Sequence, residues 1–481
     1  MDSEISQNNR KRSDEAVDGG IRSSIQRKSD SLLTKYFTGS SMDYKQIFAI
    51  IIPIFVDSAF IVLMAIMNTA MVSSSGVAAV SAVSMVDSIN MFLVNLFVAI
   101  ATGGTVIVAQ YKGRGNGEMV AKSASQAISS VAIVSVVIAA LIIVFHASTL
   151  NALFGNADAD VLHHAKIFLI GSCISYPFIA IYQAVTGVLR GVAETKACLV
   201  LSLILNVSYF LLNVILIKMF DMGVIGLSIS LILARVLGMV VSMIYLFKYN
   251  QTIRIKLRDT FLIHWSILKK ILYIGIPFAM EQMFFNGGKL LTQTFIVHLG
   301  TLAITVNAIS NSLTMLFQIG GTALSVAIVT VVGQCMGRRD IEDARKFIKS
   351  FIGLSTIFFV IITVILLLMF PMLVKLYAPP KEIVPSIFAL ILLIAIAQPI
   401  VWSFSFIMPS ALRAAGDSKF TSIASLLSMW LFRIILGYIL GITLGFGLMG
   451  VWVAMVAEWG VRGIIFAWRF RGDKWYRHKL I

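Results

Sequence analysis

The sequence has little charge for its length. Asp, Glu, Lys and Arg together make up 13% of its 481 residues, whereas hydrophobic residues make up 58%. Soluble globular proteins carry about 25% charged residues, so this chain cannot cover a water-facing surface of ordinary size. The shortage of charge excludes a soluble enzyme and a disordered protein, and it indicates a protein embedded in a membrane.

Residues that form disulfides or bind metals are also scarce. The three cysteines, Cys173, Cys198 and Cys335, lie in or beside apolar segments and lack the spacing of zinc ligands. A phosphate-binding P-loop is missing, which argues against a motor driven by ATP. We therefore expect no enzyme activity, no metal site, and no cofactor apart from a coupling ion.

Long apolar runs are abundant. Twelve segments are long enough to cross the apolar core of a bilayer, which is roughly 30 Å thick. Lys and Arg in the short loops collect on one side of these segments, as is typical of the cytoplasmic side. The net charge of +16 therefore indicates membrane orientation and not a nucleic-acid partner. We predict an all-α, multi-pass membrane protein with both termini in the cytoplasm.

The sequence also contains an internal repeat. Asp57 recurs as Glu281 (281 − 57 = 224), and the turn 190–196 recurs as 413–419 (413 − 190 = 223). Six helices have thus been duplicated, and because six is an even number both copies have the same orientation in the membrane. Halves of this kind are related by an axis along the membrane normal, with a site between them near the midplane. The repeat predicts a transporter.

The repeat and the loop charges divide the chain into five parts. We predict a disordered basic cytoplasmic tail, an N-lobe of six helices, a cytoplasmic linker, a C-lobe of six helices and a cytoplasmic C-terminal tail. Their limits are 1–45, 46–248, 249–270, 271–470 and 471–481.

The duplicated motifs resemble the multidrug and toxic compound extrusion (MATE) family over residues 46–475. The resemblance is carried by Pro53–Asp57 and Gln110–Arg114, by their copies Pro277–Glu281 and Gln334–Arg338, and by the two repeated turns. It implies twelve helices in two pseudo-symmetric six-helix bundles that form a V around a central cavity. It also implies an antiporter of the cell (inner) membrane. Such an antiporter exports amphiphilic, often cationic, drugs or toxic metabolites by alternating access, driven by inward H⁺ or Na⁺.

Three departures from the family pattern put the coupling ion in doubt. Asn68 stands where many members have an Asp, and the tenth helix contains no carboxylate. Glu281 comes four residues after its proline, whereas other branches place the acid about one turn later, where Phe285 stands here. The ion sites of the family therefore cannot be transferred whole.

Asp57 and Glu281 are the leading candidates for ion coupling. A carboxylate inside a membrane is costly and is a functional candidate by default. Each of the two lies one turn after a proline, which removes a backbone hydrogen bond and lets the helix bend. The alternative is that each acid pairs with a basic neighbour and serves packing alone.

Other polar and aromatic residues are weaker candidates. Lys289 lies eight residues after Glu281 on roughly the same helical face, either as its counter-ion or with its amine at the external interface. Asp87 is a second ion ligand with Asn90 or Asn68, or a carboxylate hydrogen-bonded across helices. Glu458 and Arg462 are expected to neutralise each other, and Arg433 is expected in packing or at the lipid interface. Aromatic residues predicted to contact a cationic substrate in the cavity are Phe284, Phe285 and Trp402.

Two other functions compete with ion-coupled export. A lipid-linked oligosaccharide flippase shares the duplicated plan, but such flippases carry a strongly basic cavity, whereas the repeated lobe-opening residues here are acidic. A structural or sensor protein has no need of matched carboxylates in both lobes. As partners we expect small amphiphilic or cationic molecules and membrane lipids, with the chain acting as a monomer.

Overall fold

The computed structural model describes residues 30–72, 77–154, 158–255, 264–377, 379–478 and 480–481. Within these ranges the protein is helical throughout, without strands. The first half contains α2 (Tyr44–Val72), α3 (Val77–Gly113), α4 (Gly117–Val144), α5 (His146–Phe154), α6 (Ala159–Gly191), α7 (Thr195–Asn213), η2 (Val214–Met219), α8 (Gly223–Ile244) and η3 (Tyr245–Tyr249).

The second half repeats this order with more interruptions. It contains α10 (Trp265–His298), α11 (Thr301–Arg338), α12 (Ile341–Tyr377), η4 (Lys381–Ile383), α13 (Val384–Ala397), η5 (Gln398–Ile407), α14 (Met408–Ala414), α15 (Ser418–Ser428), η6 (Met429–Leu436), η7 (Ile439–Thr443), α16 (Gly447–Arg471) and η8 (Lys474–Tyr476). The elements η5, η6 and η7 are π-helical stretches inside long helices. Such wide turns are frequent at functional sites.

Eleven helical spans in the described residues are long and apolar enough to cross a membrane. The twelfth is α10, which has 34 residues but is more polar because it carries Glu281 and Lys289 among its apolar residues. It begins at Trp265, so the last residues of the predicted linker 249–270 are helical. Ile267 in this added turn is buried, which explains why the helix starts before the apolar run.

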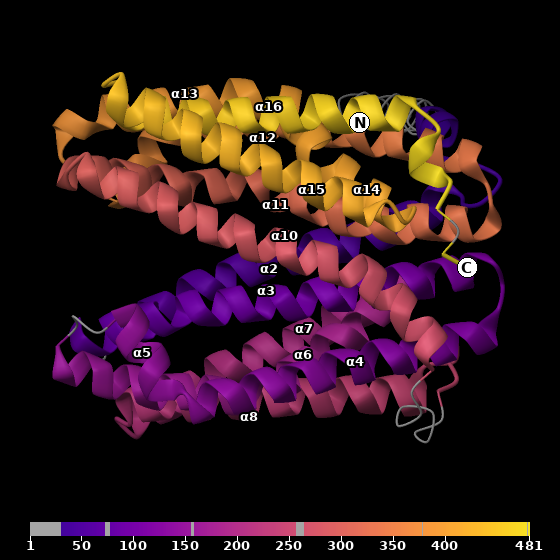
Figure 1. The fold of residues 1–481 in the computed structure, drawn as a ribbon, viewed down its shortest axis with the longest axis horizontal. Helices are drawn as coiled ribbons and strands as arrows, with labels where there is room; N and C mark the ends of the chain where they lie inside the picture. The colour runs from indigo at the N-terminus through magenta and orange to yellow at the C-terminus, as the bar shows by residue number, and fades with distance from the viewer. Residues whose placement is uncertain (1–29, 73–76, 155–157, 256–263, 378, 479) are drawn as a thin grey trace, which may run out of the picture.

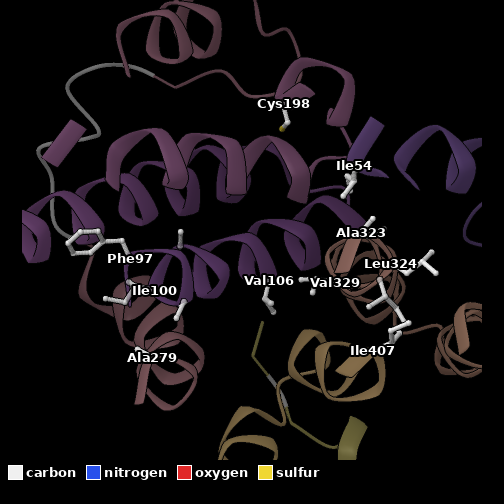
Figure 2. Close-up of a cluster of buried hydrophobic side chains, with 14 of the residues drawn as sticks. Ile54, Phe97, Ile100, Val106, Cys198, Ala279, Ala323, Leu324, Val329 and Ile407 are labelled. Atoms are coloured by element: carbon white, nitrogen blue, oxygen red, sulfur yellow. The ribbon is translucent and has the colours of Figure 1, made fainter. Parts of the chain in front are cut away.

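The twelve spans form two bundles. Figure 1 shows α2–α8, here called the N-lobe, on one side and α10–α16, the C-lobe, on the other. Helices α10 and α11 of the C-lobe pack against α3 of the N-lobe. One buried apolar cluster runs through both lobes and includes Val106 of the N-lobe and Val329 and Ile407 of the C-lobe (Figure 2).

The lobes meet at one end through a symmetric contact. Gln110 Nε2 donates to the backbone oxygen of Ala414 at 2.8 Å, and its repeat partner Gln334 donates to the backbone oxygen of Gly191 at 3.0 Å. The helices are so close that a Cβ on Gly113 would lie 2.0 Å from the Gln334 oxygen, and one on Gly337 would lie 1.9 Å from the Gln110 oxygen. Only glycine allows this approach.

The prediction of disorder is wrong for the end of the segment 1–45. Residues 30–37 form a helix, and the Phe37 ring lies 5.4 Å from that of Phe48 and 6.2 Å from that of Phe351. The Ser41 backbone N–H donates to Asp343 at 2.6 Å. Few apolar residues occur in this polar segment, but Phe37 is one of them and it is buried. Residues 1–29 lie outside the described part of the chain.

Candidate ion-coupling site and cavities

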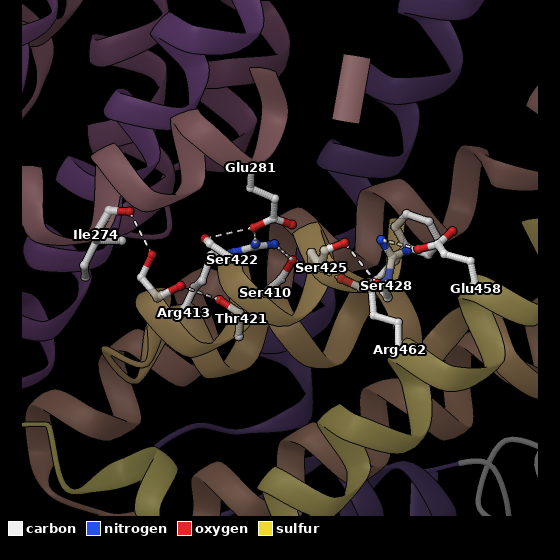
Figure 3. A network of polar contacts seen from close by, with 12 residues as sticks. Ile274, Glu281, Ser410, Arg413, Thr421, Ser422, Ser425, Ser428, Glu458 and Arg462 are labelled. Atoms are coloured by element: carbon white, nitrogen blue, oxygen red, sulfur yellow. Dashed lines mark hydrogen bonds and ion pairs between the residues drawn. The ribbon is translucent and has the colours of Figure 1, made fainter. Parts of the chain in front are cut away.

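Glu281 forms a buried ion pair in the C-lobe. It is 8% exposed on α10, and it accepts hydrogen bonds from Arg413 Nη1 at 2.8 Å and from Ser422 Oγ at 3.0 Å (Figure 3). The Arg413 guanidinium also lies 4.0 Å from the centre of the Phe278 ring. Separating a buried pair leaves an uncompensated charge. The Glu281–Arg413 pair is therefore costly to open, and neutralising Glu281 alone leaves the buried Arg413 without its counter-ion.

Asp57 occupies the same repeat position in the N-lobe, but its pair is looser. Arg190, the repeat partner of Arg413, places Nη2 3.9 Å from Asp57 Oδ2, which is too long for a hydrogen bond. Asp57 is buried, and its Oδ1 has no hydrogen-bond partner among the described residues. The N-lobe thus keeps the acid–arginine combination with weaker contacts.

Asp87 belongs to a separate polar cluster of the N-lobe. Its Oδ1 accepts from Asn90 Nδ2 at 3.1 Å, and Asn90 Oδ1 accepts from the Tyr176 hydroxyl at 2.7 Å. Arg235 donates to Ser175 Oγ at 2.7 Å. Asp87 thus contacts Asn90 within α3 and not across helices, and its role as an ion ligand stays a prediction.

Glu458 of α16 holds two arginines. Arg433 Nη2 lies 2.8 Å and Arg462 Nη1 lies 3.0 Å from its carboxylate, and all three side chains are buried. Arg462 also donates to Ser405 Oγ at 2.6 Å. The lipid-interface alternative for Arg433 is wrong, because η6 places its side chain inward against Glu458, whereas a role in packing is not contradicted. One carboxylate facing two guanidinium groups leaves a net charge of about +1 in this triad.

Two cavities of the C-lobe adjoin these charges. The larger, of about 380 Å³, is lined by Phe285, Lys289, Thr292, Gln293, Ile296, Asn307, Asn311, Thr314, Met315, Gln318, Phe406, Arg433, Val451, Trp452, Met455 and Trp459. The smaller, of about 230 Å³, includes Glu281, Trp402, Arg413 and Arg462 in its lining. Both are lined by Phe285 and Phe406. Glu281 therefore lines a cavity that shares the Phe285 and Phe406 rings with the larger one.

Comparison with known proteins gives this arrangement a family. The model of the MatE family matches residues 53–216 and again residues 277–439. The chain belongs to the MATE family. The two matched stretches correspond to the two halves of the internal repeat.

Relatives of this MATE protein cover nearly its whole length. It is 30% identical to the uncharacterized transporter YisQ of Bacillus subtilis over 89% of this chain and 94% of that one. It is 22% identical to the multidrug resistance protein MdtK of Photorhabdus laumondii over 86% and 92%. The protein is therefore a membrane transporter of the MATE multidrug efflux family.

Solved structures show the same twelve-helix fold. An outward-facing multidrug resistance MATE transporter of the MOP superfamily superposes with a TM-score of 0.83 at 20% identity, covering 89% of this chain and 95% of that one. A MATE transporter in its bent conformation gives 0.83 at 19% identity over 92% and 97%. This likeness confirms the V-shaped, two-bundle architecture.

The structure places the other predicted residues in different surroundings. Lys289 does not pair with Glu281, since Arg413 does, and its amine lies 4.9 Å from the centre of the Phe285 ring. Phe285 lines both cavities and Trp402 lines the smaller one. Phe284 is 41% exposed and is in neither lining. The side chain of Asn68 lies outside the described residues.

Arg413 and Arg433 are the residues that sequence reasoning missed. Arg413 was assigned to the repeated turn, yet the repeat itself contained the signal, because acid and arginine recur together as 57 with 190 and 281 with 413. The two acid–arginine spacings are nearly equal (190 − 57 = 133 and 413 − 281 = 132), so a search for repeated acid–base pairs would have found them. Arg433 and Ser422 had no such signal, since their contacts depend on how η6 and α15 are rotated.

Proposed function

We propose that this MATE protein is an antiporter that exports amphiphilic small molecules by alternating access, driven by inward H⁺ or Na⁺. The observation that supports it is the repeated acid–arginine pair, whose tighter copy, Glu281–Arg413, adjoins the C-lobe cavities. Intramembrane ionisable groups at such places serve transport.

Glu281 is the proposed coupling residue. While it is charged, it holds Arg413 and Ser422 and thereby ties α10 to α14 and α15. Loading of H⁺ or Na⁺ weakens this hold, and α10 can then bend at Pro277, one turn away. Because α10 carries Phe285 and Lys289, this bending changes the shape of both cavities.

Asp57 is proposed as a second, subordinate ion site, since Arg190 contacts it only at 3.9 Å. We further propose that the protein lies in the cell membrane with both termini in the cytoplasm, acts as a monomer and contacts lipid along its exposed apolar residues.

A lipid-linked oligosaccharide flippase is the second candidate. The observation that favours it is the pair of cations, Lys289 and Arg433, in the larger cavity, since an anionic headgroup needs such a lining.

Transport in proteoliposomes tests the proposal. Purified protein is reconstituted, a pH gradient and a Na⁺ gradient are imposed separately, and movement of the cation ethidium and of the anion 2-(p-toluidino)naphthalene-6-sulfonate is followed by fluorescence. We expect one gradient to drive transport and Glu281→Gln to abolish the response.

Glu382→Gln is the matched control, because Glu382 is an exposed carboxylate outside both cavities, and it should transport as the wild type does. If neither gradient moves either probe, or if Glu281→Gln retains gradient-driven transport, the proposal is wrong.

A further inference from the structure

We propose that the larger C-lobe cavity binds an anionic amphiphile, a compound with an aromatic or apolar body and a carboxylate, sulfonate or phosphate group. The inference rests on the proposed function in so far as this cavity is the cargo site. It departs from the expectation of a cationic cargo, and it is based on the charges of the C-lobe.

The C-lobe interior carries more positive than negative charge. Within the described part of the C-lobe spans, the cationic side chains that line the cavities are Lys289, Arg413, Arg433 and Arg462, and the carboxylates that face them are Glu281 and Glu458. Four positive and two negative charges leave a net charge of +2 when all are ionised. Arg413, Arg433 and Arg462 are buried, whereas Lys289 is exposed at the cavity. An anion entering this site is attracted by the excess positive charge.

The excess charge is concentrated at the larger cavity. Lys289 Nζ lies 4.9 Å and Arg433 Cζ lies 5.2 Å from the centre of the same Phe285 ring, so the two cations converge on one place. Both line the cavity, whereas no carboxylate does so among the described residues. A cationic ligand there meets Lys289, which makes no ion pair among the described residues, and Arg433, whose partner Glu458 is not in the lining, and it is repelled.

Hydrogen-bond donors remain available for an anion. Arg433 is 5% exposed, and although its Nη2 binds Glu458, its Nε has no acceptor among the described residues. Lys289 makes no ion pair in the described part of the chain. An arginine with an unpaired Nε–H group and a nearby amine can bind the oxygens of a carboxylate or phosphate with charge-assisted hydrogen bonds.

The rest of the lining suits the body of such a molecule. Phe285, Phe406, Trp452 and Trp459 provide aromatic surfaces, and the amides of Asn311 and Gln318 add neutral polar groups. The volume of about 380 Å³ falls within the range of about 300–1,000 Å³ that is usual for small-molecule sites.

Equilibrium binding to the full-length protein in detergent tests the inference without a gradient. The probes are tritium-labelled 2-naphthalenesulfonate and 2-naphthylmethylammonium, which share one ring system and differ in charge. We expect the sulfonate to bind at least about tenfold more tightly, Lys289→Met to weaken sulfonate binding by about tenfold, and Lys289→Glu to reverse the order of the probes.

Lys218→Met serves as control, since Lys218 is an exposed lysine of the N-lobe, and it should leave both affinities unchanged. The inference is overturned if the ammonium probe binds as tightly as the sulfonate, if Lys289→Met leaves their ratio unchanged, or if folded protein binds neither.

Competition identifies the source of the anion. If dihexanoyl phosphatidate displaces the sulfonate at a lower concentration than naphthyl phosphate, the cargo is a lipid. The reverse order indicates a free aromatic anion. Binding is measured without a gradient, so its outcome is separate from that of the transport assay. Sulfonate binding without gradient-driven transport refutes the proposed function alone, and transport of ethidium without sulfonate binding refutes this inference alone.

Discussion

The two lobes repeat one six-helix unit, yet three cations that line the C-lobe cavities have no basic counterpart in the N-lobe. Lys289, Arg433 and Arg462 correspond in the repeat to positions 289 − 224 = 65, 433 − 223 = 210 and 462 − 223 = 239. The N-lobe residues at these positions are Ala65, Phe210 and Met239. In contrast, the acid–arginine pair and the glutamine contacts between the lobes occur in both copies. The repeat thus keeps an acid–arginine pair within each lobe and the glutamine contacts between the lobes, whereas Lys289, Arg433 and Arg462 have no basic counterpart in the N-lobe.

The same comparison explains why the tighter ion pair lies in the C-lobe. Arg413 is 7% exposed and Arg190 is 24% exposed as side chains, so the C-lobe pair is further from water. Charges attract more strongly where the dielectric constant is low, and they are also more costly to separate there. The C-lobe is therefore the half in which a change of protonation has the larger structural effect.

Of the variants that compare the two lobes, we expect removal of the Glu458 carboxylate to change the stability most. Glu458→Gln leaves the buried Arg433 and Arg462 without a counter-ion, and we expect a loss of about 3–5 kcal/mol in unfolding free energy. Arg235→Gln, at the matching N-lobe position, loses a single hydrogen bond to Ser175 and should cost about 1 kcal/mol. Titration with SDS, followed by tryptophan fluorescence, measures both, and equal losses would contradict the contrast.

Truncating the arginines of the two pairs should have the next largest effect. Arg413→Ala leaves Glu281 buried and is expected to lower the unfolding free energy by about 3 kcal/mol. Arg190→Ala removes a longer and more exposed contact and should cost no more than about 1 kcal/mol. The same SDS titration compares them, and a larger loss for Arg190→Ala would show that the 3.9 Å pair is the stronger one.

The lobe contact should respond symmetrically. Gly113→Ala and Gly337→Ala each push a Cβ against a backbone oxygen that cannot move aside, and we expect each to cost about 1–3 kcal/mol and to separate the lobes. Spin labels at the exposed positions Glu118 and Glu342, one in each lobe, report the distance between the lobes by double electron–electron resonance. Gly353→Ala is the control, because a Cβ there meets nothing. A shift for only one glycine variant would disprove the symmetry.

The smallest effect concerns the loop between α11 and α12. Asn116 and Asp340 are repeat partners, and each accepts a backbone N–H three residues on, at 3.0 Å. Partial burial works to raise the pKa of Asp340, but hydrogen bonds from the Ser40 hydroxyl, the Asp343 backbone N–H and the Ser41 hydroxyl outweigh it and hold this pKa below its ordinary value of 3.8.

A lowered pKa in the folded protein stabilises it above the unfolded pKa, and this contribution is lost as the pH falls through the folded value. Residues 36–43 should therefore exchange amide hydrogens slightly faster, relative to the intrinsic rate, below about pH 4. In Asp340→Asn the part of this increase in amide exchange that comes from protonation of Asp340 should disappear. Hydrogen exchange with mass spectrometry detects the difference, and an unchanged pH response in Asp340→Asn would refute it.

The sequence predicted the fold more completely than the candidate site. Apolar run length and loop charge located the spans, and α10 was found although Glu281 and Lys289 make it polar. Phe37 was missed because one aromatic residue in a polar segment produces no periodic signal. Helical spacing left Lys289 either as a counter-ion of Glu281 or as a residue at the external interface. Spacing along one helix cannot reveal that Arg413, which comes 132 residues after Glu281, pairs with it instead.

The sequence by itself determined the membrane class, the twelve spans and the duplication, because the cost of placing polar groups in a bilayer leaves its mark in composition and in periodic order along the chain. Only the tertiary structure decided which charges meet. The pairing of Glu281 with Arg413, the triad around Glu458 and the convergence of Lys289 and Arg433 on Phe285 depend on the rotation and packing of separate helices. Electrostatic energy varies with distances of a few ångströms, and such distances between remote segments are set by packing in three dimensions.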